Sequence, residues 1–73
     1  MNADELLAWG RIEDAARKAD IAAAKASPDM ASGLRSAQLA AERRRKAVGL
    51  SMNQAASAVS AVQREARYAA MCK

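Results

Sequence analysis

The sequence predicts an all-α protein: a small Ala-rich three-helix bundle or helical hairpin, with dimerisation as one way to complete its core. Twenty-one of the 73 residues are alanine, the best helix former, and the chain holds only three glycines and one proline. β-Branched and aromatic residues are too few for an all-β domain. Three helix-start patterns divide residues 1–73, taken as a single domain, into three helical segments.

The first helix is expected over about residues 3–25. It begins at a capping box, because Asn2 and Glu5 stand three positions apart and can satisfy each other's free backbone N–H groups. Its apolar seam, meaning the stripe of residues that repeats in steps of three and four, should face the other helices. This seam consists of Trp9, Ile12, Ala16, Ala19, Ala23 and Ala26. Trp9 is expected to anchor the core, with a role as an interface hot spot as the alternative.

The second helix is expected over about residues 28–48. The string Ser27-Pro28-Asp29 supplies an N-cap hydroxyl, a proline suited to the first helical position and a carboxylate facing the positive end of the helix. Gly33 leaves open a later start near Ser32, after a longer loop. The predicted seam of this helix consists of Met30, Leu34, Ala37, Ala41, Arg44 and Val48.

The third helix is expected over about residues 52–71. Ser51 and Gln54 form a second capping box, and Gly49 suits the left-handed residue that closes the preceding helix. The predicted seam consists of Met52, Ala55, Val59, Val62, Ala66 and Ala69. An alternative stays open in which the second and third helices continue through Gly49 as one long helix in a dimer.

Alanine seams predict a thin core. A buried alanine offers one methyl group, worth about 0.8 kcal/mol, so a lone chain of this length gains little from packing. We therefore expect a second copy or a partner to cover part of the surface. Among the apolar residues off the seams, Leu6 and Leu39 are expected to widen the core. Leu7, Ile21 and Tyr68 are expected to form an apolar partner-binding surface.

The net charge of +4 gathers in the second half of the chain. Arg43 to Lys46 are four basic residues in a row, and successive positions point to all sides of a helix. Arg44 falls on the apolar seam, so either the helix end projects beyond the bundle or Arg44 reaches water or an acidic partner along its stem. Basic residues in a last turn also complement the helix dipole. The predicted partner-binding basic patch comprises Arg35, Arg43, Arg44, Arg45, Lys46, Arg64 and Arg67.

Residues 47–56, Ala-Val-Gly-Leu-Ser-Met-Asn-Gln-Ala-Ala, are similar to the first turn of a helix-turn-helix DNA-binding motif. The resemblance implies a small dimeric nucleic-acid-binding regulator that uses residues 47–67, with Arg64 and Arg67 facing phosphates. The sequence departs from the motif at residues 59–62, Val-Ser-Ala-Val, where a glycine should mark a second turn. A helix that stops before a newly capped helix accounts for the same string.

Composition argues against most chemistry. The chain has no histidine, and its single cysteine, Cys72, excludes an intramolecular disulfide, so we expect no catalytic site, no cofactor, no metal and no small-molecule substrate. The longest charge-free run, residues 47–63, is interrupted by polar side chains and is not a membrane span. The acidic residues at the start are unlike a secretion signal, and we expect a cytoplasmic protein.

Together these features predict a small non-enzymatic helical interaction protein that binds and blocks or adapts a larger macromolecule. Its expected partner is a larger protein with an acidic surface, or a second copy of the chain. Its size and style resemble accessory or inhibitory proteins of bacteria and phages. The nucleic-acid-binding regulator is the alternative.

Overall fold

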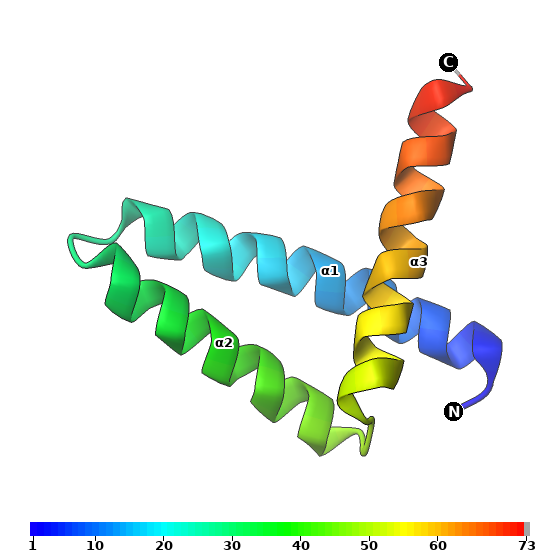
Figure 1. The fold of residues 1–73 in the computed structure, drawn as a ribbon, viewed down its shortest axis with the longest axis horizontal. Coiled ribbons are helices and arrows are strands. Elements are labelled where there is room, and N and C mark those ends of the chain that lie inside the picture. The colour runs from blue at the N-terminus through cyan, green and yellow to red at the C-terminus, as the bar shows by residue number, and fades with distance from the viewer. Residues whose placement is uncertain (73) are drawn as a thin grey trace.

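The computed structural model describes residues 1–72 and contains three helices: α1 (Ala3–Ala26), α2 (Met30–Ala47) and α3 (Met52–Met71). The prediction of an all-α chain with three helices is confirmed, and every boundary lies within two residues of its predicted position. α1 and α2 form an antiparallel hairpin, and α3 returns from the open end of that hairpin to cross α1 (Figure 1).

Both predicted capping boxes are present. Asn2 accepts a hydrogen bond from the Glu5 backbone N–H at 2.8 Å, and Glu5 accepts one from the Asn2 N–H at 3.3 Å. The corresponding distances between Ser51 and Gln54 are 3.1 and 2.9 Å. These side chains satisfy backbone donors that the first turn leaves free, and they fix the starts of α1 and α3.

The start of α2 differs from the prediction, because its N-cap is Asp29 rather than Ser27. The Asp29 carboxylate accepts a hydrogen bond from the Ser32 backbone N–H at 3.1 Å, and the helix begins at Met30. Ser27 instead ends α1 in an extended conformation, with φ −76° and ψ 144°. The residue before a proline is driven out of the helical region by the proline ring, so Pro28 makes Ser27 a stop.

The chain turns between α2 and α3, so these helices do not continue into each other. Gly49 has φ +73°, a left-handed conformation that other residues rarely adopt. Its N–H donates to the Lys46 carbonyl at 3.1 Å, and the Leu50 N–H donates to the Arg45 carbonyl at 3.2 Å. Leu50 is buried at this corner. The turn is therefore held by backbone hydrogen bonds and by the burial of the Leu50 side chain.

Glycines mark the points of closest approach between helices. A Cβ atom added to Gly10 on α1 would lie 2.9 Å from the carbonyl oxygen of Ala58 on α3. A Cβ added to Gly33 on α2 would lie 2.9 Å from the Cα of Ala24 on α1. Any larger residue would push these backbones apart, so each glycine sets the distance between two helices.

The predicted seam of α1 holds at Trp9 and Ala16, which are half-buried, and is wrong at its other positions. Ile12 is 72% exposed, and Ala19, Ala23 and Ala26 are also exposed. The stripe that packs instead is more polar and repeats with the same alternating spacing. It consists of Leu6, Gly10, Glu13, Arg17, Asp20 and Ala24. After Trp9 and Ile12 the predicted seam offers only methyl groups, whereas the stripe that packs offers a glycine for close approach and carboxylates for Arg44.

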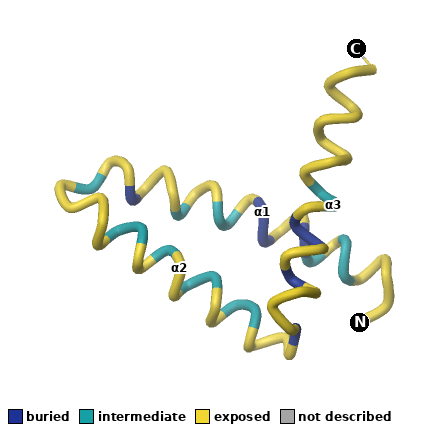
Figure 2. Tube along the Cα trace, viewed as in Figure 1, coloured by how far each residue is buried: buried dark blue, intermediate teal, exposed yellow. Residues whose placement is uncertain are grey.

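The predicted seams of α2 and α3 hold in part. Leu34, Ala37, Ala41 and Arg44 on α2 are half-buried and Ala55, Val59 and Val62 on α3 are buried or half-buried, whereas Met30, Val48 and Met52 are exposed. Ala66 and Ala69 are exposed because the second half of α3 continues past α1 (Figure 2). Among the off-seam residues, Leu6 is half-buried as predicted. Leu39 is 53% exposed, so its expected place in the core is wrong.

The molecule is flat and has a thin core. Its extents are 37 × 35 × 15 Å, because α3 crosses the hairpin instead of running alongside it. The radius of gyration is 13.5 Å, whereas a compact chain of this length has about 11 Å. The exposed surface is 5351 Å², about 1,000 Å² more than the roughly 4,300 Å² of a compact 7.7 kDa monomer. The buried apolar residues of the described part of the chain are Ala24, Leu50, Ala55, Ala58 and Val59.

Replacing Gly10 with valine should separate α1 from α3. The added side chain meets backbone atoms of Ala58, which cannot move aside as a flexible side chain can. We expect G10V to lower the free energy of unfolding by about 2 kcal/mol, a typical cost of overpacking. Urea denaturation followed by circular dichroism measures this.

The matched control is A22V, at an exposed position of the same helix, where only the lower helix propensity of valine acts, at about 0.5 kcal/mol. If G10V were no less stable than A22V, the close approach of α1 and α3 at Gly10 would be refuted.

Candidate interaction surface

A buried ion pair joins α1 to α2. The Glu13 carboxylate is 1% exposed and accepts hydrogen bonds from Arg44 Nε at 2.7 and 3.1 Å and from Arg44 Nη2 at 3.0 Å. Arg17 Nε adds a bond to the same carboxylate at 3.3 Å. Arg44 Nη1 bonds Asp20 at 3.0 Å. A carboxylate removed from water in this way needs such direct, charge-assisted partners.

This cluster explains why a cation lies on the seam of α2. The hydrogen bonds that Arg44 donates to Glu13, and then to Asp20, raise the pKa of its guanidinium above the usual value, so it stays charged. Arg44 neither projects from the end of the structure nor reaches outward, because it is held by carboxylates of α1. Sequence reasoning missed these partners. The signal was present, since Glu13 and Asp20 are seven residues apart and so share one face of a helix.

The two residues that follow are also bound within the chain. Arg45 Nη1 donates to the Leu50 carbonyl at 2.9 Å, and its side chain is 18% exposed. Lys46 Nζ lies 3.1 Å from Glu42 Oε1, and Arg45 Nη2 lies 3.8 Å from the same oxygen. Within this run, Arg45 closes the α2–α3 corner, Arg44 joins α2 to α1, and Lys46 pairs with Glu42 within α2.

The remaining predicted basic residues are exposed and have no carboxylate within 4 Å among residues 1–72. They are Arg35 and Arg43 on α2 and Arg64 and Arg67 on α3. Within this described part, nearly every acidic side chain is already engaged. Five carboxylates form ion pairs, while Glu5 and Asp29 cap helices. The net positive charge of the molecule therefore consists of unpaired surface cations.

Polar contacts also fix α3 on α1. Asp14 is bonded by Lys18 Nζ at 3.0 Å and by Gln63 Nε2 at 3.4 Å. The bond from Lys18 outweighs the desolvation of the carboxyl and lowers the pKa of Asp14. Three residues before Asp14 on α1 and two after Gln63 on α3, Arg11 and Glu65 form an exposed ion pair at 3.3 Å. The C-terminal end of α3 projects away from α1 (Figure 1).

The three residues predicted to form an apolar partner-binding surface differ in their solvent exposure. Leu7 is half-buried, Ile21 is 41% exposed and Tyr68 is 73% exposed. Sequence reasoning missed Ile12, which it placed in the core, and Met71, which is 82% exposed at the end of α3. Tyr68 and Met71 therefore lie on the same free helix end as Arg64 and Arg67.

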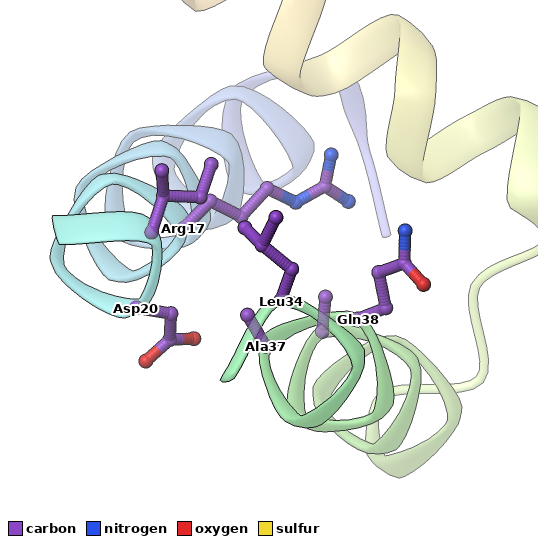
Figure 3. A pocket seen from close by; sticks show the side chains of 7 residues that line it. Arg17, Asp20, Leu34, Ala37 and Gln38 are labelled. Carbon is purple, nitrogen blue, oxygen red and sulfur yellow. The ribbon is translucent and has the colours of Figure 1, made fainter. Parts of the chain in front are cut away.

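A shallow groove of about 380 Å³ lies between α1 and α2 (Figure 3). Leu34 points from α2 toward α1 and forms part of its floor, while Asp20 lies on the side opposite the Arg17 guanidinium. The lining residues are Arg17, Asp20, Ile21, Leu34, Ala37, Gln38 and Ala41. Because Arg17 is bonded to Glu13 and Asp20 to Arg44, the charged groups at the rim belong to the buried cluster.

The described helices show neither a metal site nor a membrane span. Across residues 1–72, no three carboxylate or thiol side chains converge as metal ligands would. None of the three helices combines the length and apolar character that crossing a bilayer requires. α3 is one uninterrupted helix from Met52 to Met71, so the second turn of a helix-turn-helix motif is absent from this part of the chain.

No protein-family model, no curated protein and no solved structure matches the chain. The function is therefore inferred from the charges and surfaces of the molecule itself.

Replacing Arg44 with methionine should strongly destabilise the protein. Glu13 would remain buried with only the bond from Arg17, and an uncompensated buried charge costs about 3 kcal/mol. Urea denaturation followed by circular dichroism should show this loss for R44M.

Two further variants test whether the loss of stability comes from the buried Glu13 carboxylate or from the removal of any ion-paired charge. R11M breaks an exposed ion pair, with both side chains more than half exposed, and should cost less than about 1 kcal/mol. The double variant E13L/R44M removes both charges and should regain most of the stability that R44M loses. Equal stabilities of R44M and R11M would contradict the assigned role of the pair.

Proposed function

We propose that this protein is a small non-enzymatic interaction protein that binds an acidic surface of a larger protein and blocks or adapts it. The proposal is carried by the division of charge. Seven of the eight carboxylates are engaged in ion pairs or caps, whereas four exposed arginines have no ion-pair partner among residues 1–72: Arg35, Arg43, Arg64 and Arg67. Such cations attract an acidic surface and orient it before contact.

The area of exposed surface supports the proposal. The excess of about 1,000 Å² over a compact monomer is close to the roughly 800 Å² that each partner contributes to a standard interface. A second copy of the chain is the other molecule that can cover this area. In both cases, contact with another macromolecule adds the apolar burial that the thin core lacks.

A non-enzymatic role fits the available groups. The chain has no histidine to act as a general base, and most carboxylates are already committed to ion pairs or helix caps. The single thiol, Cys72, fits a reducing compartment such as the cytoplasm. By analogy of size and style, accessory or inhibitory proteins of bacteria and phages are the class that we propose.

Removing the unpaired cations should remove partner binding. We expect the variant R35Q/R43Q/R64Q/R67Q to lose proteins that the wild-type chain retains when immobilised and exposed to a bacterial lysate. Quantitative mass spectrometry compares the retained proteins, which should be acidic. Because all four side chains are exposed, circular dichroism should show an unchanged helix content.

The matched control is A8E/A15E/A22E/A26E, which lowers the net charge by the same four units at exposed positions of α1. It should retain the same acidic proteins as the wild type, apart from a modest general weakening. Loss of the same proteins by both variants, or no loss by either, would overturn the proposal.

A nucleic-acid-binding regulator, dimeric as the sequence suggests, is the second candidate. It is favoured by the outward face of α3, which carries small polar residues and two cations. The face comprises Asn53, Ser57, Ser60, Arg64 and Arg67, all exposed and none acidic. A narrow helix of this kind can approach a DNA groove closely. The uninterrupted α3 counts against the helix-turn-helix form of this candidate.

Salt dependence tests the second candidate. If α3 and the end of α2 make about six phosphate contacts, affinity for duplex DNA should fall roughly a thousandfold between about 50 and 200 mM salt. Fluorescence anisotropy with a labelled duplex measures this, and R64Q/R67Q should reduce the slope by about two phosphate contacts. Absence of binding at low salt would remove the candidate.

A further inference from the structure

The second half of α3 leaves the body of the molecule. Every residue from 63 to 71 is exposed (Figures 1 and 2). Within residues 1–72, the side-chain hydrogen bonds and ion pairs of this segment are those of Gln63 with Asp14 and of Glu65 with Arg11. These contacts lie at the start of the segment. From Ala66 onward the helix has no such support, although helices this short gain most of their stability from packing.

One face of this free segment has the spacing of a docking helix. Arg64, Arg67, Tyr68 and Met71 stand at positions i, i+3, i+4 and i+7, which lie together on a helix surface. Tyr68 is 73% exposed and Met71 is 82% exposed. Arginine, tyrosine and methionine are enriched in the centres of protein interfaces, where the first two often dominate binding.

We propose that this face, the α3 docking face, inserts into a groove on the partner that has acidic walls and an apolar floor. The inference rests on the proposed function and assigns its surface. The two guanidinium groups would pair with carboxylates of the partner, because neither has a carboxylate within 4 Å in the described chain. The ring of Tyr68 and the thioether of Met71 would pack against apolar side chains of the partner that lie between those carboxylates.

Two other occupants fit this face less well. A second copy packed on it symmetrically would gather four guanidinium groups in one interface, because a two-fold interface is built from the same patch on both copies. Duplex DNA would satisfy both arginines. Its major groove offers apolar contact mainly through thymine methyl groups, which leaves Tyr68 and Met71 poorly used.

Synthetic polymers test the proposed chemistry directly. The probes are poly-L-glutamate, a random copolymer of glutamate and tyrosine, and a duplex DNA of similar charge, each fluorescently labelled for anisotropy titrations against the full-length chain. We expect the copolymer to bind more tightly than poly-L-glutamate, because it supplies apolar rings as well as carboxylates. We also expect it to bind more tightly than the duplex.

Matched variants locate the binding face. R64Q/R67Q and R35Q/R43Q each remove two positive charges from exposed positions, so their net charges are equal. R64Q/R67Q should weaken copolymer binding about tenfold, as expected for the loss of interface arginines, whereas R35Q/R43Q should change it less than about threefold. Y68A/M71A should abolish the preference for the copolymer over poly-L-glutamate without changing helix content.

Each contrary outcome has a definite meaning. Equal weakening by the two arginine pairs would overturn the α3 docking face while leaving binding to an acidic partner intact. Tighter binding to duplex DNA, or no binding to either acidic polymer, would overturn both that face and the proposed function. If Y68A/M71A still bound the copolymer more tightly than poly-L-glutamate, the apolar floor would be refuted. If the chain formed a dimer that R64Q/R67Q strengthened, the face would be assigned to contact with a second copy, and the docking proposal would be wrong.

Discussion

The buried Glu13 carboxylate decides how the helices of this protein face one another. It sits against Arg44 and Arg17, and Arg44 also reaches Asp20. A charge in this position tolerates little misalignment, because the attraction offsets the loss of hydration only when the hydrogen bonds form. The pair therefore selects one rotation of α1 relative to α2, which alanine methyl groups alone could not do. Specificity here comes from polar contacts inside a core that supplies little apolar burial.

The same property explains what sequence reasoning recovered. Helix starts were readable because a cap side chain and its backbone donor lie three residues apart, as for Asn2 with Glu5 and Ser51 with Gln54. The rotation of α1 was not readable from apolar periodicity, because alanine occurs on several of its faces. Gly10 and the carboxylates that meet Arg44 decided it, and both depend on contacts across more than twenty residues. At Ser27, the following proline decided the boundary.

The positive charge of the expected basic patch could be predicted from the sequence, but not which of its residues the fold would leave exposed. Seven basic residues formed one expected patch, yet the fold divides them by the partners it offers: Arg44, Arg45 and Lys46 have oxygen partners within the chain, and the others face water. Sequence position places Arg43 beside Arg44, but one step along a helix turns a side chain by about 100°. Which cations remain available is thus a property of the tertiary structure.

Because α3 crosses α1 at Gly10 and Ala58, the position of its far end depends strongly on the crossing angle of the two helices. From Ala58 to Met71 the helix extends about 20 Å, at 1.5 Å per residue. A rotation of about 10° around the crossing would move that end by about 3 Å. Such a rotation would have to lengthen the contacts of Asp14 with Gln63 and of Arg11 with Glu65. These two polar pairs therefore set the angle at which the exposed end of α3 leaves the α1–α2 hairpin.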